Sequence, residues 1–128
     1  MKILLDTHVF IWWAGEPEKL SPNALEACND QDNDLILSVV SVWEMQIKMQ
    51  IGKLKLNRPL RDLIEAQKGA NDFQILPVSL DHVFRLENLP MHHRDPFDRL
   101  LIAQTMEEGS VLVSKDEIFS DYAVNLLW

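Results

Sequence analysis

The chain has 128 residues, of which 47% are hydrophobic and 25% are charged, an ordinary composition for one globular domain. Twelve Lys and Arg residues against 20 Asp and Glu residues give a net charge of −8, which excludes a basic coat of the histone or repressor kind. Cys28 is the single cysteine, so an intrachain disulfide and a Cys/His zinc site are excluded too. We expect one domain over residues 1–128, with only local contacts to any nucleic acid.

The beginning of the chain does not resemble a targeting segment. Lys2 is followed by only three apolar residues before Asp6, whereas a signal peptide needs a longer apolar region. No stretch approaches the roughly 20 apolar residues of a membrane span. We therefore expect a protein without a membrane segment, in the reducing cytoplasm.

Four short runs rich in Ile, Leu and Val have the pattern of buried strands, and segments with helical spacing separate them. In chain order the predicted elements are a strand over 3–5, two helices within 8–29 broken around Gly15 and Pro17, a strand over 35–40, helices over 41–50 and 59–69, a strand over 73–78, helices over 79–87 and 96–108, a strand over 111–113, and a weak edge strand within 123–127. Alternating strands and helices predict an α/β fold with a parallel sheet.

Several helix starts have recognisable caps. Ser21-Pro22 and Asp95-Pro96 each combine an N-cap residue with Pro at the first helical position. Ser41 and Glu44 have the spacing of a capping box. Helices that follow strands begin at the carboxyl edge of a parallel sheet, where open α/β folds bind their ligands. We therefore look for function at that edge.

Four carboxylates from distant parts of the chain are predicted at this edge. Asp6 ends the first strand, Glu44 and Asp98 lie in the first turns of two helices, and Asp116 follows the strand over 111–113. Like charges ~4 Å apart repel by about 4 kcal/mol at an effective dielectric of ~20, so a fold that gathers them needs a cation or raised pKa values. Oxygen ligands favour Mg²⁺ or Mn²⁺, which could activate water against a phosphodiester.

Taken singly, most of these acids have an ordinary explanation. Capping and the helix dipole favour an acid in a first turn, so Glu44 and Asp98 could be caps, and Asp116 could be a turn residue. Asp95 is expected to cap its helix and is left outside the core set. Only Asp6 lacks a helix pattern of its own, so the metal hypothesis depends on the four acids together.

Other polar residues adjoin these acids. The hydroxyls of Thr7 and Ser114 could hold a carboxylate in place. His92 and His93 are adjacent, so they point in different directions, and we expect loop residues near the entrance of the site.

Cations concentrate in one stretch, because no acid occurs between Met45 and Arg61 while five Lys and Arg residues do, counting Arg61. Lys48 lies on the helix that presents Glu44, and Arg99 follows Asp98, so these two side chains could contact phosphates. The ordinary alternative is a solvated helix face.

Four ordered segments, residues 4–13, 38–54, 93–104 and 114–116, resemble the PIN-domain family, and more closely its VapC-like toxins of type II toxin–antitoxin systems. They include Asp6-Thr7-His8, Trp43-Glu44, Asp95-Pro96-Phe97-Asp98-Arg99 and Ser114-Lys115-Asp116. The resemblance extends over nearly the whole chain, and the segments are specific in combination although each alone is weak.

The resemblance implies a three-layer α/β/α sandwich around a central parallel sheet and Mg²⁺- or Mn²⁺-dependent cleavage of RNA. It also implies neutralisation by a small cognate antitoxin and a homodimer within a heteromeric complex. The family's acidic site falls on Asp6, Glu44, Asp98 and Asp116, with its hydroxyls at Thr7 and Ser114. Asp98 rather than Asp95 is taken as the metal ligand, because the helix pattern of the family starts at Asp98.

The leading hypothesis is a metal-dependent endoribonuclease. Asp6, Asp98 and Asp116 would hold the metal, Glu44 would complete the site, and Glu44 or a water would take the proton from the attacking water. Arg99 and Lys48 would position phosphates.

Two alternatives come from other functional classes. One is a phosphorylatable receiver-like signalling domain, which needs an acid at the end of the third strand, where the sequence has none. The other is a catalytically silent binding module whose acids only cap helices.

Overall fold

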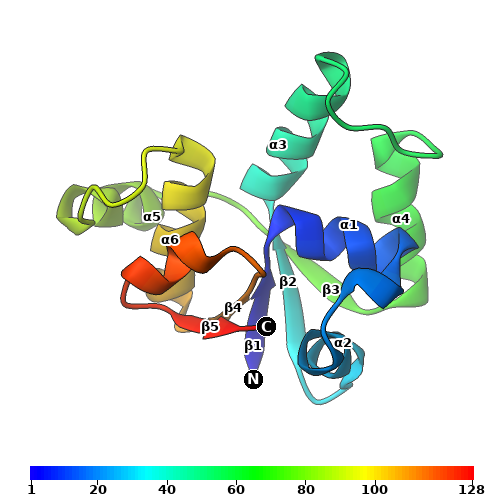
Figure 1. Ribbon diagram of the computed structural model, residues 1–128, viewed down its shortest axis with the longest axis horizontal. Helices are drawn as coiled ribbons and strands as arrows, with labels where there is room; N and C mark the ends of the chain where they lie inside the picture. The colour runs from blue at the N-terminus through cyan, green and yellow to red at the C-terminus, as the bar shows by residue number, and fades with distance from the viewer.

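The computed structural model describes residues 1–128 as a five-stranded parallel sheet with six α-helices (Figure 1). The elements are β1 (Lys2–Leu5), α1 (Thr7–Gly15), α2 (Pro22–Asn29), β2 (Asp34–Ser38), α3 (Val39–Gln50), α4 (Leu60–Ala70), β3 (Phe73–Leu76), α5 (Leu80–Arg85), α6 (Pro96–Glu108), β4 (Val111–Val113) and β5 (Asn125–Leu127), with short 3₁₀ helices η1 (Pro17–Lys19), η2 (Leu86–Asn88) and η3 (Glu117–Asp121). None of the helices combines the length and apolar character that crossing a membrane requires. The predicted α/β fold with a parallel sheet, including the edge strand β5, is confirmed.

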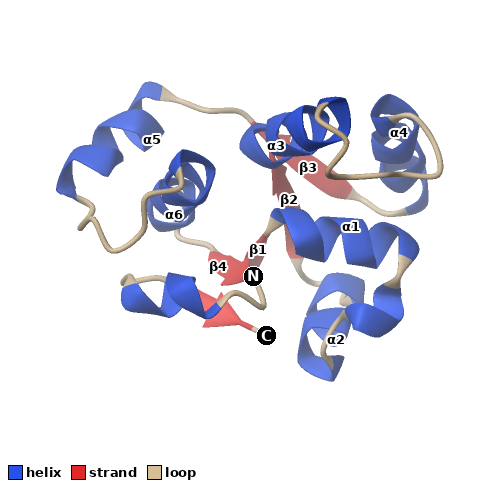
Figure 2. Ribbon diagram, turned by 45° about the horizontal axis from the view of Figure 1, so that its top comes forward, coloured by secondary structure: helices blue, strands red, loops and turns tan.

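Each face of the sheet builds its own hydrophobic core. Leu4 of β1 pairs in register with Ile36 of β2 and Leu112 of β4, and this row packs with α6 and the η3 segment. The residues one step further on in each strand point to the opposite face, where the core also contains side chains from α1, α2, α3 and α4. Figure 2 shows α1, α2 and α4 on one side of the sheet and α5 and α6 on the other. The structure is therefore a three-layer α/β/α sandwich.

The strand order β3-β2-β1-β4-β5 determines where a ligand can bind. The chain moves outward from β1 through β2 to β3, and then returns through α5 and α6 to β4 on the other side of β1. The connections after β1 and β4 therefore diverge, and open α/β sheets bind ligands at such a switch point, outside the carboxyl ends of the strands. Asp6 follows β1 directly, and Ser114 follows β4 directly.

The start of α3 differs from the prediction. β2 ends at Ser38 rather than at residue 40, and the Ser38 Oγ accepts a hydrogen bond from the Val40 N–H at 3.0 Å. Ser38 is therefore the N-cap, Ser41 lies buried inside the helix, and the predicted capping box of Ser41 and Glu44 is wrong. The apolar run that continues through residues 39 and 40 reads equally well as strand or as buried helix, so periodicity alone misplaced the boundary.

The other predicted caps are confirmed. The Ser21 Oγ accepts from the Ala24 N–H at 3.1 Å. The Asp95 Oδ1 accepts from the N–H groups of Phe97 and Asp98 at 2.8 and 3.2 Å. The predicted strand over 73–78 ends at Leu76, because Pro77 follows and has no N–H for the ladder.

A buried polar network holds α3 and α6 together. The Ser38 Oγ donates to the Gln104 Oε1 on α6, and both residues are fully buried. The Gln104 amide donates in turn to the Pro77 carbonyl at 3.3 Å. Nearby, His82 is bonded to Ser79 N–H through Nδ1 and to Glu108 through Nε2, both at 3.0 Å. Because α3 and α6 carry Glu44 and Asp98, this network also sets the separation of those two acids.

Replacing Ser38 tests the network. We expect Ser38→Ala to lower the free energy of unfolding by about 2–4 kcal/mol, since it removes a helix cap and leaves the Gln104 Oε1 buried without a donor. Urea unfolding followed by tryptophan fluorescence measures the change. Ser120→Ala, at an exposed serine, is the control and should stay within about 0.5 kcal/mol of the parent. An equal effect of the two substitutions would contradict the structural role of Ser38.

Candidate metal centre and active site

Asp6 occupies the centre of the site. Its Oδ1 accepts from the Thr7 N–H at 2.7 Å as the N-cap of α1, and its Oδ2 accepts from the Ser114 Oγ at 2.7 Å. The residue is only 8% exposed. Burial raises the pKa of Asp6 above its usual value, although the hydrogen bonds from Ser114 and Thr7 oppose the shift, and the charge of Glu44 adds to it. Asp6 is thus a buried carboxylate, fixed between the ends of two strands.

Glu44 lies in the second turn of α3, not at its cap. Its Oε1 accepts from the Thr7 Oγ1 at 2.6 Å, and its Oε2 pairs with the Lys48 Nζ at 3.1 Å. Thr7 therefore joins the two acids, since its N–H binds Asp6 and its hydroxyl binds Glu44. The explanation of Glu44 as a capping residue fails because its carboxylate reaches α1 instead.

Asp98 faces the same region from the first turn of α6. Its Oδ2 lies 2.7 Å from the His93 Nε2. Burial raises the pKa of Asp98 to about 6, the hydrogen bond from His93 opposes this, and the charges of Asp95, Asp6 and Glu44 raise the pKa further. Asp6, Glu44 and Asp98 thus lie close enough to repel one another.

Asp116 is placed differently from the other three acids. It is exposed, and its Oδ1 accepts from the Ile118 N–H at 3.1 Å, so it caps η3. Its own N–H donates to the Ser114 Oγ at 3.1 Å, which links it to the hydroxyl that holds Asp6. Asp6 and Asp116 both line a pocket of about 210 Å³, together with His8, Val9, Trp12 and Lys115. Asp116 therefore lines the pocket beside Asp6, and it also has the turn role that was the ordinary explanation from the sequence.

His93 was expected only as a loop residue near the entrance of the site, yet its imidazole contacts Asp98. Ligand atoms of His93, Asp95 and Asp98 all lie within 4.8 Å of one another. The sequence offers one signal for this contact, since His93 lies just before the Asp95-Pro96 helix start. The chain that leads into a capped helix can fold back over the first turn of that helix.

The two predicted phosphate contacts, Lys48 and Arg99, both have partners within the chain. Lys48 pairs with Glu44. The Arg99 guanidinium donates to the carbonyls of Pro90 and Leu89 at 2.8 and 3.4 Å. Arg99 thus stabilises the loop before α6, and RNA binding by either residue stays a prediction.

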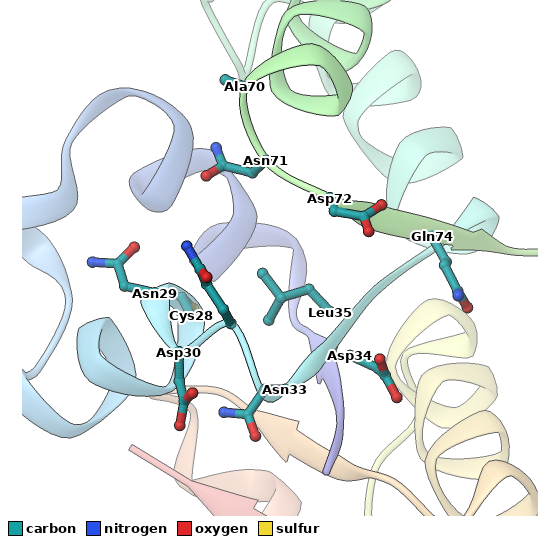
Figure 3. A pocket seen from close by; sticks show the side chains of 11 residues that line it. Cys28, Asn29, Asp30, Asn33, Asp34, Leu35, Ala70, Asn71, Asp72 and Gln74 are labelled. Carbon is teal, nitrogen blue, oxygen red and sulfur yellow. The ribbon is translucent and has the colours of Figure 1, made fainter.

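A larger cavity lies away from the acids. It measures about 440 Å³ and is lined mostly by amide and carboxylate side chains where the chain enters β2 and β3. Figure 3 shows Asp30, Asp34 and Asp72 around it. These residues precede or begin the strands, at the amino edge of the sheet, so this cavity takes no part in the site at the carboxyl edge.

The donor set fits a hard divalent cation. Asp6, Glu44 and Asp98 offer carboxylate oxygens only, and the pKa values of Asp6 and Asp98 are raised first by burial and further by the charges of neighbouring acids. Mg²⁺ and Mn²⁺ prefer such oxygen ligands and would offset the repulsion.

The fold and the site define an α/β protein with an acidic centre at the switch point of a parallel sheet. The family model of the PIN domain matches residues 3–125, and the chain belongs to the PIN domain family. It is 30% identical over 115 residues to Ribonuclease VapC22 of Mycobacterium tuberculosis, which covers 89% of this chain and 86% of that relative. The family expected from the sequence is confirmed, and the receiver-domain alternative is excluded.

Solved structures share the fold at low sequence identity. VapBC2 from Rickettsia felis, bound to a DNA fragment from its promoter, gives a TM-score of 0.71 at 16% identity and covers 99% of this chain and 98% of that chain. FitAcB from Neisseria gonorrhoeae gives 0.66 at 20% identity, with coverage of 98% and 96%. The likeness in fold therefore extends over almost the whole of this chain.

Removing the charge of Asp98 should stabilise the metal-free protein. With a pKa of about 6 in the folded state against 3.8 in the unfolded chain, the folded state binds more protons between these values, so stability falls as the pH rises through them. We expect Asp98→Asn, measured by urea unfolding in EDTA, to gain about 1–3 kcal/mol at about pH 7.5 and nothing near pH 4.

Asp72→Asn, at an exposed acid on the opposite edge, is the matched control and should gain nothing at either pH. A loss of stability in Asp98→Asn at about pH 7.5 would contradict the repulsion inferred at the site.

Proposed function

We propose that this chain is a metal-dependent endoribonuclease and the toxin of a toxin–antitoxin pair. The observation that carries the proposal is the placement of three carboxylates, Asp6, Glu44 and Asp98, at the switch point of a PIN domain, where the charges of Asp6 and Glu44 raise the pKa of Asp98. The name of the relative, Ribonuclease VapC22, supports RNA as the substrate. We propose the cytoplasm as its location, because its proposed substrate, cellular RNA, is present there.

Asp6, Asp98 and Asp116 would hold Mg²⁺ or Mn²⁺, with Glu44 beside them. Such an ion, when bound, polarises water and offsets charge on the scissile phosphate. Ser114 and the Thr7 N–H keep the Asp6 carboxylate in one orientation, so it does not have to reorganise during the reaction.

Glu44 is the base that we propose for the attacking water. The Thr7 hydroxyl and Lys48 bind its two oxygens, and its side chain is 13% exposed, so it is oriented and still reachable. Lys48, with 34% of its side chain exposed, can turn from Glu44 to a phosphate. We retain Arg99 as a weaker candidate for phosphate binding.

Related complexes support one of the proposed partners. VapBC2 of Rickettsia felis and a toxin–antitoxin complex from Klebsiella pneumoniae share this fold, which supports a small cognate antitoxin for this chain. We also propose a homodimer. Leu80, Val83 and Phe84 form an i, i+3, i+4 stripe on α5 and are 70%, 44% and 61% exposed, an apolar surface that a second copy would cover.

RNA cleavage tests the proposed activity. Purified protein is incubated with total cellular RNA in Mg²⁺ or Mn²⁺, with an EDTA lane and with Asp6→Asn prepared identically. We expect cleavage that EDTA abolishes and that Asp6→Asn lowers by about 100-fold or more, because the buried ligand loses its charge. Asp34→Asn, at the amino edge of the sheet, should cleave like the parent.

Equal cleavage in all lanes would identify a contaminating nuclease. Cleavage by pure protein that survives both EDTA and Asp6→Asn would refute the metal mechanism. No cleavage in any lane, with no metal bound in a titration, would favour the silent binding module instead.

The dimer has its own test. We expect light scattering to give about twice the chain mass for the parent and a monomer for Phe84→Glu, since a buried charge would oppose association. Asn23→Glu, an exposed position on α2, should leave the mass unchanged. A monomeric parent at tens of micromolar would contradict the dimer.

A further inference from the structure

We propose that His93 is a positioning residue of the acidic site, which holds the Asp98 carboxylate in the orientation that binds a divalent ion. The inference rests on the proposed function and adds a residue to the four acids. It starts from the 2.7 Å contact between the His93 Nε2 and the Asp98 Oδ2. The two side chains are only 23% and 20% exposed, so water competes weakly with this bond.

The direction of the hydrogen bond follows from its chemistry. An ionised carboxylate only accepts, so a proton on the His93 Nε2 must lie in the bond when Asp98 is charged. The bond occupies Oδ2, and the structure shows no hydrogen bond to Oδ1, which is left for a cation. His93 therefore fixes Asp98 without using both of its ligand atoms.

The position of His93 is itself determined by the fold. The His93 N–H donates to the Tyr122 hydroxyl at 2.9 Å, and Tyr122 is buried in the core beside α6. Arg99 donates to the Pro90 carbonyl at 2.8 Å, the Tyr122 hydroxyl at 3.4 Å and the His93 carbonyl at 3.5 Å. The backbone of His93 is thus bonded on both sides, and the turn of α6 that carries Asp98 also anchors the loop that carries His93.

Neighbouring groups do not share this role. The Asp95 Oδ1 accepts the N–H groups of Phe97 and Asp98, so Asp95 caps α6 and makes no hydrogen bond to the Asp98 carboxylate. His92 is exposed, and its ring packs against Tyr122 at 5.4 Å between centroids. A histidine that donates to a ligating carboxylate typically changes metal affinity by about 10–100-fold when it is removed. His92 offers a matched control one residue away.

The experiment is calorimetric titration of Mn²⁺, and of Mg²⁺, into the full chain freed of metal with EDTA, at about pH 7.5. We expect His93→Ala to weaken Mn²⁺ binding by about 10-fold or more. His93→Gln, whose amide can donate to Asp98, should stay within about 3-fold of the parent, and so should His92→Ala. Urea unfolding in EDTA establishes that each variant is folded.

A second measurement needs no variant. Long-range ¹H–¹⁵N spectra of the parent should show a proton on the His93 Nε2. A neutral ring protonated only at Nδ1 would overturn the inference, because it could not donate to the Asp98 carboxylate.

The titration also separates this inference from the proposed function. Unchanged Mn²⁺ binding by His93→Ala would overturn the role of His93. Tighter binding would overturn it too, because His93 would then compete with the metal for Asp98. Asp98→Asn should abolish binding in the same titration. Unchanged binding by Asp98→Asn would instead refute the metal site of the proposed function, and with it the present inference.

Discussion

β1 pairs in parallel with β2 on one side and with β4 on the other, and the position of each site residue depends on this pairing. The pairing is stable because both faces of β1 are buried, each by its own core. It brings the residues that follow β1, β2 and β4 to one edge, so Asp6 reaches Ser114, and α3 starts beside α1. Packing of α6 on the second face then brings Asp98 to the same edge.

Each of the three central carboxylates is held by a side-chain donor. Ser114 holds Asp6, Thr7 holds Glu44 and His93 holds Asp98. The hydroxyls of Ser114 and Thr7 carry no charge, so they orient Asp6 and Glu44 without neutralising them, and Lys48 is the cation that pairs with Glu44. The pKa values of Asp6 and Asp98 are raised first by burial and then by neighbouring carboxylates, and a divalent cation would relieve the repulsion.

We expect the buried acids to lower the stability of the metal-free fold, and a polar network joins the helices that carry them. Ser38 and Gln104 join α3 to α6 beneath the acids, where water cannot replace their hydrogen bond. Arg99 and Tyr122 do the same for the loop that carries His93. Helices that carry like charges are in this way kept at a constant separation.

Local sequence patterns determined the kind of fold and much of the site. Apolar runs identified the strands, and Ser21 and Asp95 marked two helix starts. Asp6 was singled out because an acid directly after a central strand showed no helix pattern of its own, although the structure shows that it also caps α1. Each of these signals lies within a few residues, where hydrogen bonds and the alternation of side chains depend on the chain alone.

Only the tertiary structure decided the remaining points. It placed the cap of α3 at Ser38, turned Glu44 toward Thr7 across 37 positions of the chain, and brought His93 against Asp98 through the loop that Arg99 anchors. Contacts of this kind depend on strand order and on how a loop closes. Those are properties of the packed domain, because many distant residues must bury their side chains together before such a contact can form.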